Sequence, residues 1–383
     1  MIKNWVGKIH LWLGLASGIV VLIVSLTGCI YVFNQEFTKL ARKEAIHITH
    51  PSNSPALLPS QLFENARKFL GENKPIGWVN IYNNPEKSWA FYTYKGNEEA
   101  TTYFDMIDYY ESVYIDPYLG KVTGNYNEKT DFFNIIKYLH WSLLLSTEIG
   151  QPIVGWSTLI FVILLITGLV LWWPRSFKSA KNLFWIRWKK TTSATRKSYD
   201  LHNVLGFYSL IFALVIALTG MVWSFQWFQA AVYVVASGTT VPPAIEVKQS
   251  TPEQIKQVNA MDIAFLQTTQ KYAYAAEFRI VPPADSLAAI NIYVGEKEDV
   301  YYKTHQLQFD QYSGKLLDER THNDKNFGEK LITANYDIHV GAILGLPGKI
   351  LAFFVSLICA SLPVTGFLVW WNKRKKQRKP LFQ

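Results

Sequence analysis

Hydrophobic positions in this chain are concentrated in four long runs that are nearly free of charged residues. The runs cover residues 11–33, 152–173, 204–228 and 350–371, and each is about 20 residues or longer. A helix of that length crosses the hydrocarbon core of a bilayer, whereas buried helices of a soluble protein rarely need unbroken apolar runs of this kind. We therefore predict four membrane-spanning helices in the lipid bilayer.

The segments between the first and second runs and between the third and fourth runs have a different pattern. Residues 59–70 and 251–271 have helical periodicity, and segments such as "SWAFYTYKG" and "AAINIYVG" alternate as strands do. We predict two small α+β domains, one in each of these loops. Neither loop contains a phosphate-binding glycine loop or a catalytic spacing that we can identify.

The distribution of charge predicts the orientation of the helices. The chain start, the segment 174–201 and the tail after residue 371 contain sixteen basic residues and one acidic residue, Asp200. The long loops 34–139 and 228–338 contain 21 basic and 27 acidic residues. Positive residues mark the cytoplasmic side, so we expect both termini inside and both long loops outside. The net charge of +9 thus follows from topology and indicates no nucleic-acid partner, although "FWIRWKK" (184–190) is suited to anionic headgroups.

The chain is predicted to be an internal duplication of one helix–domain–helix unit. Runs one and three begin with His10 and His202, and each histidine is followed by Leu-Thr-Gly, with the threonine 17 residues later. Runs two and four follow His140 and His339, with the Thr-Gly pair 27 and 26 residues later. The outer loops also match, since "YIDPYLGKVTG" and "FDQYSGKLLDE" share an Asp, a Gly and a Lys at the same spacing. Two such units give parallel repeats related by an axis near the membrane normal.

The predicted organisation has eight segments. They are helix 1 (1–33), outer domain 1 (34–139), an interfacial segment with helix 2 (140–173), a basic cytoplasmic loop (174–201), helix 3 (202–228), outer domain 2 (229–338), an interfacial segment with helix 4 (339–371), and a basic tail (372–383).

Half of the eight histidines occupy equivalent places in the duplication. Ionisable residues at membrane depth are costly and usually functional, although four interfacial histidines bonded to headgroups remain an alternative. His10 and His202 are expected near the cytoplasmic face, and His140 and His339 near the outer face. Two facing imidazoles without a helping Cys, Asp or Glu complete a zinc site poorly, but they suit the two axial positions of a b-type haem. The sequence therefore predicts two non-covalent haems, each held by one histidine pair.

Each run also contains a Thr-Gly pair at the depth of one predicted haem. The glycines are expected to make room for the flat macrocycle, and the threonines to bond either their own helix or the cofactor. Ordinary packing of small residues is an equal alternative. The residues are Thr27, Gly28, Thr167, Gly168, Thr219, Gly220, Thr365 and Gly366.

The remaining candidates have weaker signals. Cys29 and Cys359 are the only cysteines, which excludes a disulfide framework and c-type haem attachment. The Leu-Thr-Gly-Cys stretch that ends at Cys29 is similar to a lipoprotein cleavage box, but its counterpart at 218–220 favours a retained helix. The unmatched histidines, which we expect to be solvated on the surface, are His47, His50, His305 and His322.

The chain resembles the PepSY-associated transmembrane family of bacteria. The resemblance rests on "KIHLWLGLASGIVVLIVSLTG", "LHWSLLL" with "TGLVLWWPR", "LHNVLG" with its "LTG", "IHVG" with "TGFLVWW", and the PepSY-like "YIDPYLGKVTG". It implies an inner-membrane protein of the kind that carries two haems and reduces ferric siderophores in the periplasm. The histidine pairs would then be the axial ligands.

The resemblance does not identify the electron donor or exclude other functions. No nucleotide-binding motif is present, so the electron donor would be a cytoplasmic partner, a soluble reductant or a quinol. PepSY modules elsewhere accompany peptidases, which makes a binding or regulatory role without redox chemistry the main alternative. A divalent-metal transporter is disfavoured because no carboxylate lies within the four runs.

Overall fold

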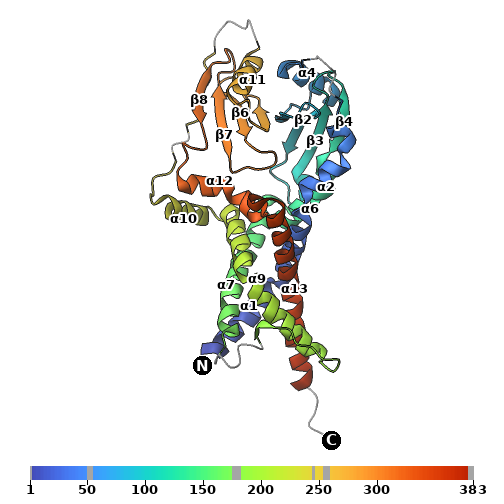
Figure 1. Ribbon diagram of the computed structural model, residues 1–383, viewed down its shortest axis with the longest axis vertical. Coiled ribbons are helices and arrows are strands. Elements are labelled where there is room, and N and C mark those ends of the chain that lie inside the picture. The colour runs from blue at the N-terminus through green and yellow to red at the C-terminus, as the bar shows by residue number, and fades with distance from the viewer. Residues whose placement is uncertain (1, 50–54, 175–182, 244–245, 253–258, 378–383) are drawn as a thin grey trace. The chain divides into compact units, whose positions relative to one another are not determined.

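The protein is described by a computed structural model covering residues 2–49, 55–174, 183–243, 246–252 and 259–377 (Figure 1). The first part of the helix expected at 251–271, His50, and several basic residues of 174–201 and of the tail lie outside these residues. The described chain forms two compact units, a helical bundle of residues 1–32, 136–229 and 338–383 and a sheet unit of residues 33–135 and 230–337. Each unit is treated separately below.

The helical bundle contains four helices that are long and apolar enough to cross a membrane, as predicted. They are α1 (Ile2–Tyr31), α7 (Thr147–Trp172), α9 (Ala194–Ser224) and α13 (Gly345–Gln377). Helix α1 packs against α7 and α13, and α9 packs against the same two helices. Helices α1 and α9 are therefore diagonal partners across the bundle, as are α7 and α13.

Short helices precede two of the long ones. His140 lies in α6 (Phe132–Ser142) and His339 ends α12 (Phe327–His339). After α6 the backbone takes positive φ at Leu143 and Leu144, and after α12 it does so at Gly341, so the chain turns before each long helix begins. The predicted interfacial segments at 140 and 339 therefore belong to separate helices, each ending before its membrane helix starts.

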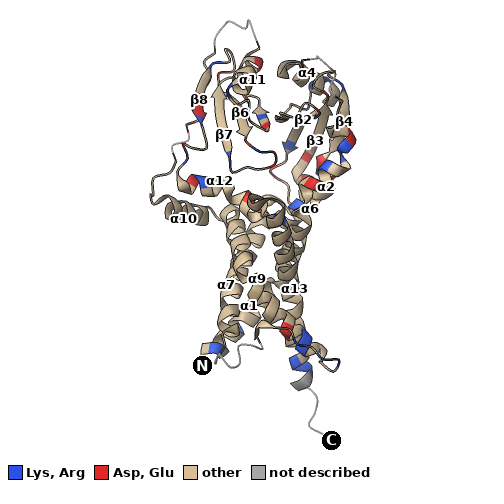
Figure 2. Ribbon diagram, viewed as in Figure 1, with Lys and Arg blue, Asp and Glu red and all other residues tan. Residues whose placement is uncertain are grey.

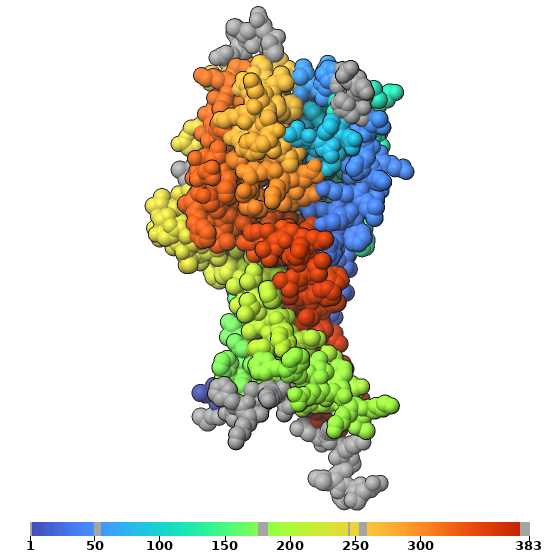
Figure 3. Space-filling model, viewed as in Figure 1, coloured from blue at the N-terminus to red at the C-terminus, as the bar shows by residue number. Residues whose placement is uncertain are grey.

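The sheet unit holds one continuous antiparallel sheet, in the order β4-β3-β2-β1-β5-β6-β7-β8. Two separate outer domains were predicted, but β1 pairs with β5, placing Val79 opposite Ile280 and joining the halves. The strands are β1 Trp78–Tyr82, β2 Trp89–Gly96, β3 Ile107–Ile115, β4 Val122–Asn127, β5 Glu277–Val281, β6 Ile290–Gly295, β7 Thr304–Phe309 and β8 Leu316–Arg320. In Figure 3 the surfaces of the two halves adjoin without a break.

Both halves of the sheet unit share one hydrophobic core beneath a pair of helices. Helices α4 (Pro59–Leu70) and α11 (Ala260–Lys271) pack over the sheet, and fully buried residues of both halves, such as Phe91 and Ile292, meet in this core. Asp262 accepts hydrogen bonds from the backbone N–H of Ser60 (2.9 Å) and from its hydroxyl (2.6 Å), which fixes the two helices together.

The smaller elements complete the two units. They are α2 Asn34–Ala41, α3 Lys43–Ile46, α5 Tyr103–Met106, η1 Glu128–Thr130, α10 Gln226–Ser237 and η2 Ala342–Leu344. The two Asp–Gly–Lys turns have matching geometry, because Gly120 and Gly314 have φ of +66° and +70° and each donates a 2.9 Å bond to the aspartate four residues earlier.

A buried ion pair anchors the chain between α2 and α3 to the sheet. Arg42 is 5% exposed and donates to Glu128 and to Asp131 at 3.0 Å each. Arg42→Ala should destabilise the sheet unit by about 3–5 kcal/mol, because it leaves the Glu128 carboxylate buried without a cation. Pulse proteolysis in urea measures this loss. Arg67→Ala, at an exposed pair with Glu64, is the matched control and should cost under about 1 kcal/mol.

A carboxyl group on β5 gives the sheet unit a pH-dependent stability. Burial, reinforced by the nearby charge of Asp299, raises the pKa of Glu277 to about 7. The folded state therefore binds this proton more tightly than the unfolded chain, and stability should fall as pH rises from about 4.5 to 7, by up to about 3 kcal/mol. Glu277→Gln should flatten that slope in urea unfolding followed across this pH range. An unchanged slope would show that other groups cause it.

Candidate functional site

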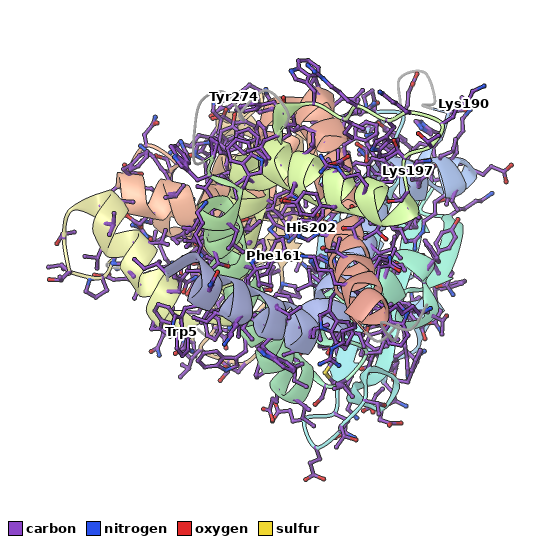
Figure 4. The ribbon with its side chains drawn as sticks, turned by 90° about the horizontal axis from the view of Figure 1, so that it is seen from below. Trp5, Phe161, Lys190, Lys197, His202 and Tyr274 are labelled. Carbon is purple, nitrogen blue, oxygen red and sulfur yellow. The ribbon has the colours of Figure 1, made fainter. Side chains whose placement is uncertain are left out.

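The four mirrored histidines form two pairs inside the helical bundle, as the sequence predicts. His10 of α1 faces His202 of α9, with ring centroids 6.3 Å apart and planes at 89°. His140 of α6 faces His339 of α12, with centroids 6.1 Å apart and planes at 71°. In the view from below, His202 lies among the four helices, whereas Trp5 and Lys190 lie at the periphery (Figure 4).

Every one of the four imidazoles is held through its Nδ1 atom by a neighbouring helix. Each Nδ1 lies within hydrogen-bonding distance of the threonine hydroxyl of a Thr-Gly pair and of the backbone carbonyl three residues before that threonine. The threonine distances are His10–Thr167 2.9 Å, His140–Thr27 3.2 Å, His202–Thr365 3.0 Å and His339–Thr219 2.9 Å. The carbonyls belong to Leu164, Val24 (2.8 Å), Leu362 (3.1 Å) and Ile216 (3.0 Å).

These contacts determine which ring nitrogen carries the proton. A carbonyl only accepts, and each threonine hydroxyl donates to its own helix, as Thr27 does to Ile23 at 2.7 Å. Each Nδ1 must therefore be the N–H donor, which leaves the Nε2 lone pair free for a metal. Two Nε2 acceptors cannot hydrogen-bond to each other, so each pair is arranged for a third group between them.

The separation of the rings fits an iron between them. Two metal–imidazole bonds of about 2.0 Å, plus about 1.1 Å from each Nε2 to its ring centre, place the centroids about 6.2 Å apart. The observed 6.3 and 6.1 Å agree with that value. Among the described residues no group of three or more His, Cys, Asp or Glu could hold a metal ion by itself.

The Thr-Gly pairs lie directly against the histidine rings. A Cβ added at Gly28 would lie 3.0 Å from Cε1 of His140, and one at Gly366 would lie 3.2 Å from Cε1 of His202. A Cβ added at Gly168 would lie 3.4 Å from Cε1 of His10, and one added at Gly220 would lie 3.5 Å from Cε1 of His339. The glycines therefore make room for the histidine rings, and the threonines bond those rings in addition to their own helices. Contact of these glycines with the macrocycle stays a prediction.

Apolar side chains fill the bundle between the two histidine pairs. One buried cluster contains Leu165, Ala213, Val355 and Cys359, and a second contains Val162, Ala217 and Met221. His10 and Thr27, which bonds the other pair, are separated by 17 residues of one helix, or about 25 Å. Over the matching intervals α1, α7 and α9 contain no Asp, Glu, Lys or Arg, and α13 contains none between Lys349 and Lys373, so the ribbon there is largely tan in Figure 2. Phe161 packs against both clusters, and it lies among the four helices in the view from below (Figure 4).

One end of the bundle is rich in basic and aromatic side chains. Lys3 donates to the Trp173 carbonyl at 2.7 Å and so caps α7. Asp200, two residues before His202, is 7% exposed and accepts from Arg196 (2.8 Å) and from the Trp188 indole (3.2 Å). The charge of Asp200, the single acidic residue of this basic segment, is thus paired with that of Arg196, within one helical turn of His202.

The prediction of surface positions for the unmatched histidines is wrong for His305. It is 5% exposed, its Nδ1 accepts the backbone N–H of His322 at 3.2 Å, and its ring packs on Tyr272. Burial lowers its pKa although Glu296 lies nearby. His322 is half-buried, and of the three unmatched histidines that the structure describes, only His47 is exposed. Strand alternation in "THQLQF" could have shown that His305 shares a face with buried Leu307.

The bundle and the sheet unit together define a polytopic membrane protein with a large extramembrane portion. The family model of the PepSY-associated TM region matches residues 8–373, nearly the whole chain, and the protein belongs to that family. A search of curated proteins gave no match.

Proposed function

We propose that this protein is a haem-dependent reductase that passes electrons across the bacterial inner membrane to a ferric chelate. The His10–His202 pair would hold one b-type haem near the cytoplasmic face, and the His140–His339 pair a second near the periplasmic face. The arrangement of the imidazoles carries the proposal: the rings form two pairs with centroids 6.3 and 6.1 Å apart, and the contacts made by every Nδ1 leave the Nε2 lone pairs available as ligands.

The protein's own residues would prepare both sites before a cofactor enters. The Nδ1 bonds orient each imidazole, and donation to a carbonyl raises the basicity of the Nε2 ligand. The apolar layer excludes water and ions from the path between the sites. A haem iron with two imidazole ligands supplies one-electron chemistry without an open position, which suits electron transfer better than substrate binding.

The reaction balances as a one-electron transfer. A cytoplasmic protein, a soluble reductant or a quinol would be oxidised at one face, and each electron would reduce one chelated Fe³⁺ to Fe²⁺ at the other. A quinol would give two electrons and release two protons, so it would reduce two Fe³⁺ ions. Ferrous iron binds hard oxygen ligands less tightly, so reduction would release it from a siderophore or a similar chelate. Both termini would be cytoplasmic, and the sheet unit would lie in the periplasm, where the chelate arrives. The basic residues of the chain start, of segment 174–201 and of the tail support this orientation, and membership of the family supports a location in a membrane.

Reconstituted protein tests the proposal directly. Purified protein should be red, with a reducible Soret band and about two haems per chain. In liposomes loaded with reductant, it should reduce an external, membrane-impermeant ferric chelate, and empty liposomes should not. A colourless protein that does not take up haem would overturn the proposal and favour the binding or regulatory role.

A further inference from the structure

Trp172, near the basic end of α7, has a buried hydrogen-bond donor without an acceptor. Its side chain is 8% exposed, and among the described residues no atom accepts from its indole Nε1. Buried indole N–H groups nearly always have a partner, because leaving one unpaired costs free energy. The position therefore calls for an acceptor that the described chain does not supply.

Aromatic packing prevents this indole from turning away. Phe207 of α9 stacks on it at 3.8 Å between ring centroids and 12° between planes. Phe184 meets it edge-on at 5.1 Å. Rotating the Trp172 N–H toward solvent would break the stack, so the donor is fixed within the bundle.

The helical position of Trp172 places it beside the His10–His202 site. Phe161, Leu165, Gly168 and Trp172 follow the spacing of one helix face. Leu165 lies in a buried cluster with residues of α9 and α13, and Gly168 abuts the His10 ring. Trp172 comes one turn later, about 6 Å further toward the basic end.

We propose that the Trp172 Nε1–H donates a hydrogen bond to a carboxylate of the haem held by His10 and His202. This inference rests on the proposed function. A b-type haem carries two carboxylate side chains on one edge, and an indole N–H is a donor suited to one of them. The Lys3 ammonium at the same end, 2.7 Å from the Trp173 carbonyl, adds a positive charge that favours this orientation of the macrocycle.

Haem loss from the intact holoprotein tests the inference. Trp172→Phe keeps an aromatic ring against Phe207 and removes only the N–H, and Trp173→Phe, at an exposed neighbour, is the matched control. Each protein is mixed with excess apomyoglobin, and release is followed at the Soret band. Trp172→Phe should accelerate one of the two release phases about tenfold and leave the other unchanged, whereas the control should match wild type.

Reconstitution with haem dimethyl ester separates this bond from general packing. The ester lacks carboxylates, so wild type and Trp172→Phe should release it at the same rate. Equal rates with ordinary haem, or an equal acceleration with haem and with the ester, would overturn the inference. A raised KM for quinol with unchanged haem release would also overturn the inference, because the Trp172 N–H would then bind the quinol and not the haem. Wild-type protein without haem would instead overturn the proposed function itself.

Discussion

Replacing either histidine of one pair should reduce the haem content from about two per chain to one. His202→Ala removes an axial ligand, and His10 alone cannot hold a low-spin six-coordinate iron, so the cytoplasmic-side haem should be lost or become high-spin. The His140–His339 haem should be retained, because its ligands and their Nδ1 bonds come from other turns of the bundle. Electron transfer across the membrane should fall to background, since one of the two steps is missing.

Two further variants separate ligation from folding. His202→Met supplies a sulfur ligand, and it should preserve a six-coordinate haem while raising its potential. His47→Ala, at an exposed histidine outside the bundle, should leave both haems and the transfer rate unchanged. Electron paramagnetic resonance and redox titration follow both haems separately. Full haem content in His10→Ala and His202→Ala would contradict the assignment.

The second large expected effect is faster haem loss after substitution of a glycine that lies against the His140–His339 pair. Gly28→Ala adds a Cβ 3.0 Å from Cε1 and 3.4 Å from Nδ1 of His140, which is tighter than most Cβ contacts, so the ring must shift by a few tenths of an ångström. Overpacking of this kind costs about 1–3 kcal/mol, and it acts here on the ligand itself. The outer haem should therefore be lost roughly tenfold faster or more.

Gly220→Ala is the matched control because it lies behind the partner ligand. Its Cβ would be 3.5 Å from Cε1 of His339, an ordinary van der Waals contact, so haem loss should stay near wild type. Both variants add one methyl group to a membrane helix, so a general packing defect would affect them equally. Equal haem loss in the two would show that the ligand rings are not the sensitive element.

Sequence patterns predicted the membrane helices and the histidine pairs because both follow from local rules. Helix length is set by the bilayer, and the repeated spacing relates His10 to His202 without knowledge of tertiary contacts. The sequence could not show which histidine each Thr-Gly pair contacts, because that depends on which helices pack together. Thr27 is bonded by His140, 113 residues away in the chain, so spacing alone could suggest a common depth but could not show the contact.

The single sheet could not be read from the sequence for a related reason. Pairing Val79 with Ile280 joins strands about two hundred residues apart, and edge strands carry no signal for a specific partner. The carbonyls of Val24 and Leu362, which complete the Nδ1 contacts, also have no side-chain signature. The burial of Trp172 depended on Phe207 of another helix.

The apolar layer between the two histidine pairs has an electrical consequence. Residues 11–27 and the matching parts of α7 and α9 contain no carboxylate, ammonium or guanidinium group, and α13 contains none from residue 350 to residue 372. We therefore expect an electron to cross this layer without an accompanying proton. Each turnover would then move one negative charge outward, away from a cytoplasm that is itself negative, which is the favourable direction. Moving a full charge through 100 mV contributes about 2.3 kcal/mol. The free energy available for electron transfer through the bundle would thus rise with the membrane potential. An uncoupler, which collapses that potential, should slow external iron reduction in intact cells.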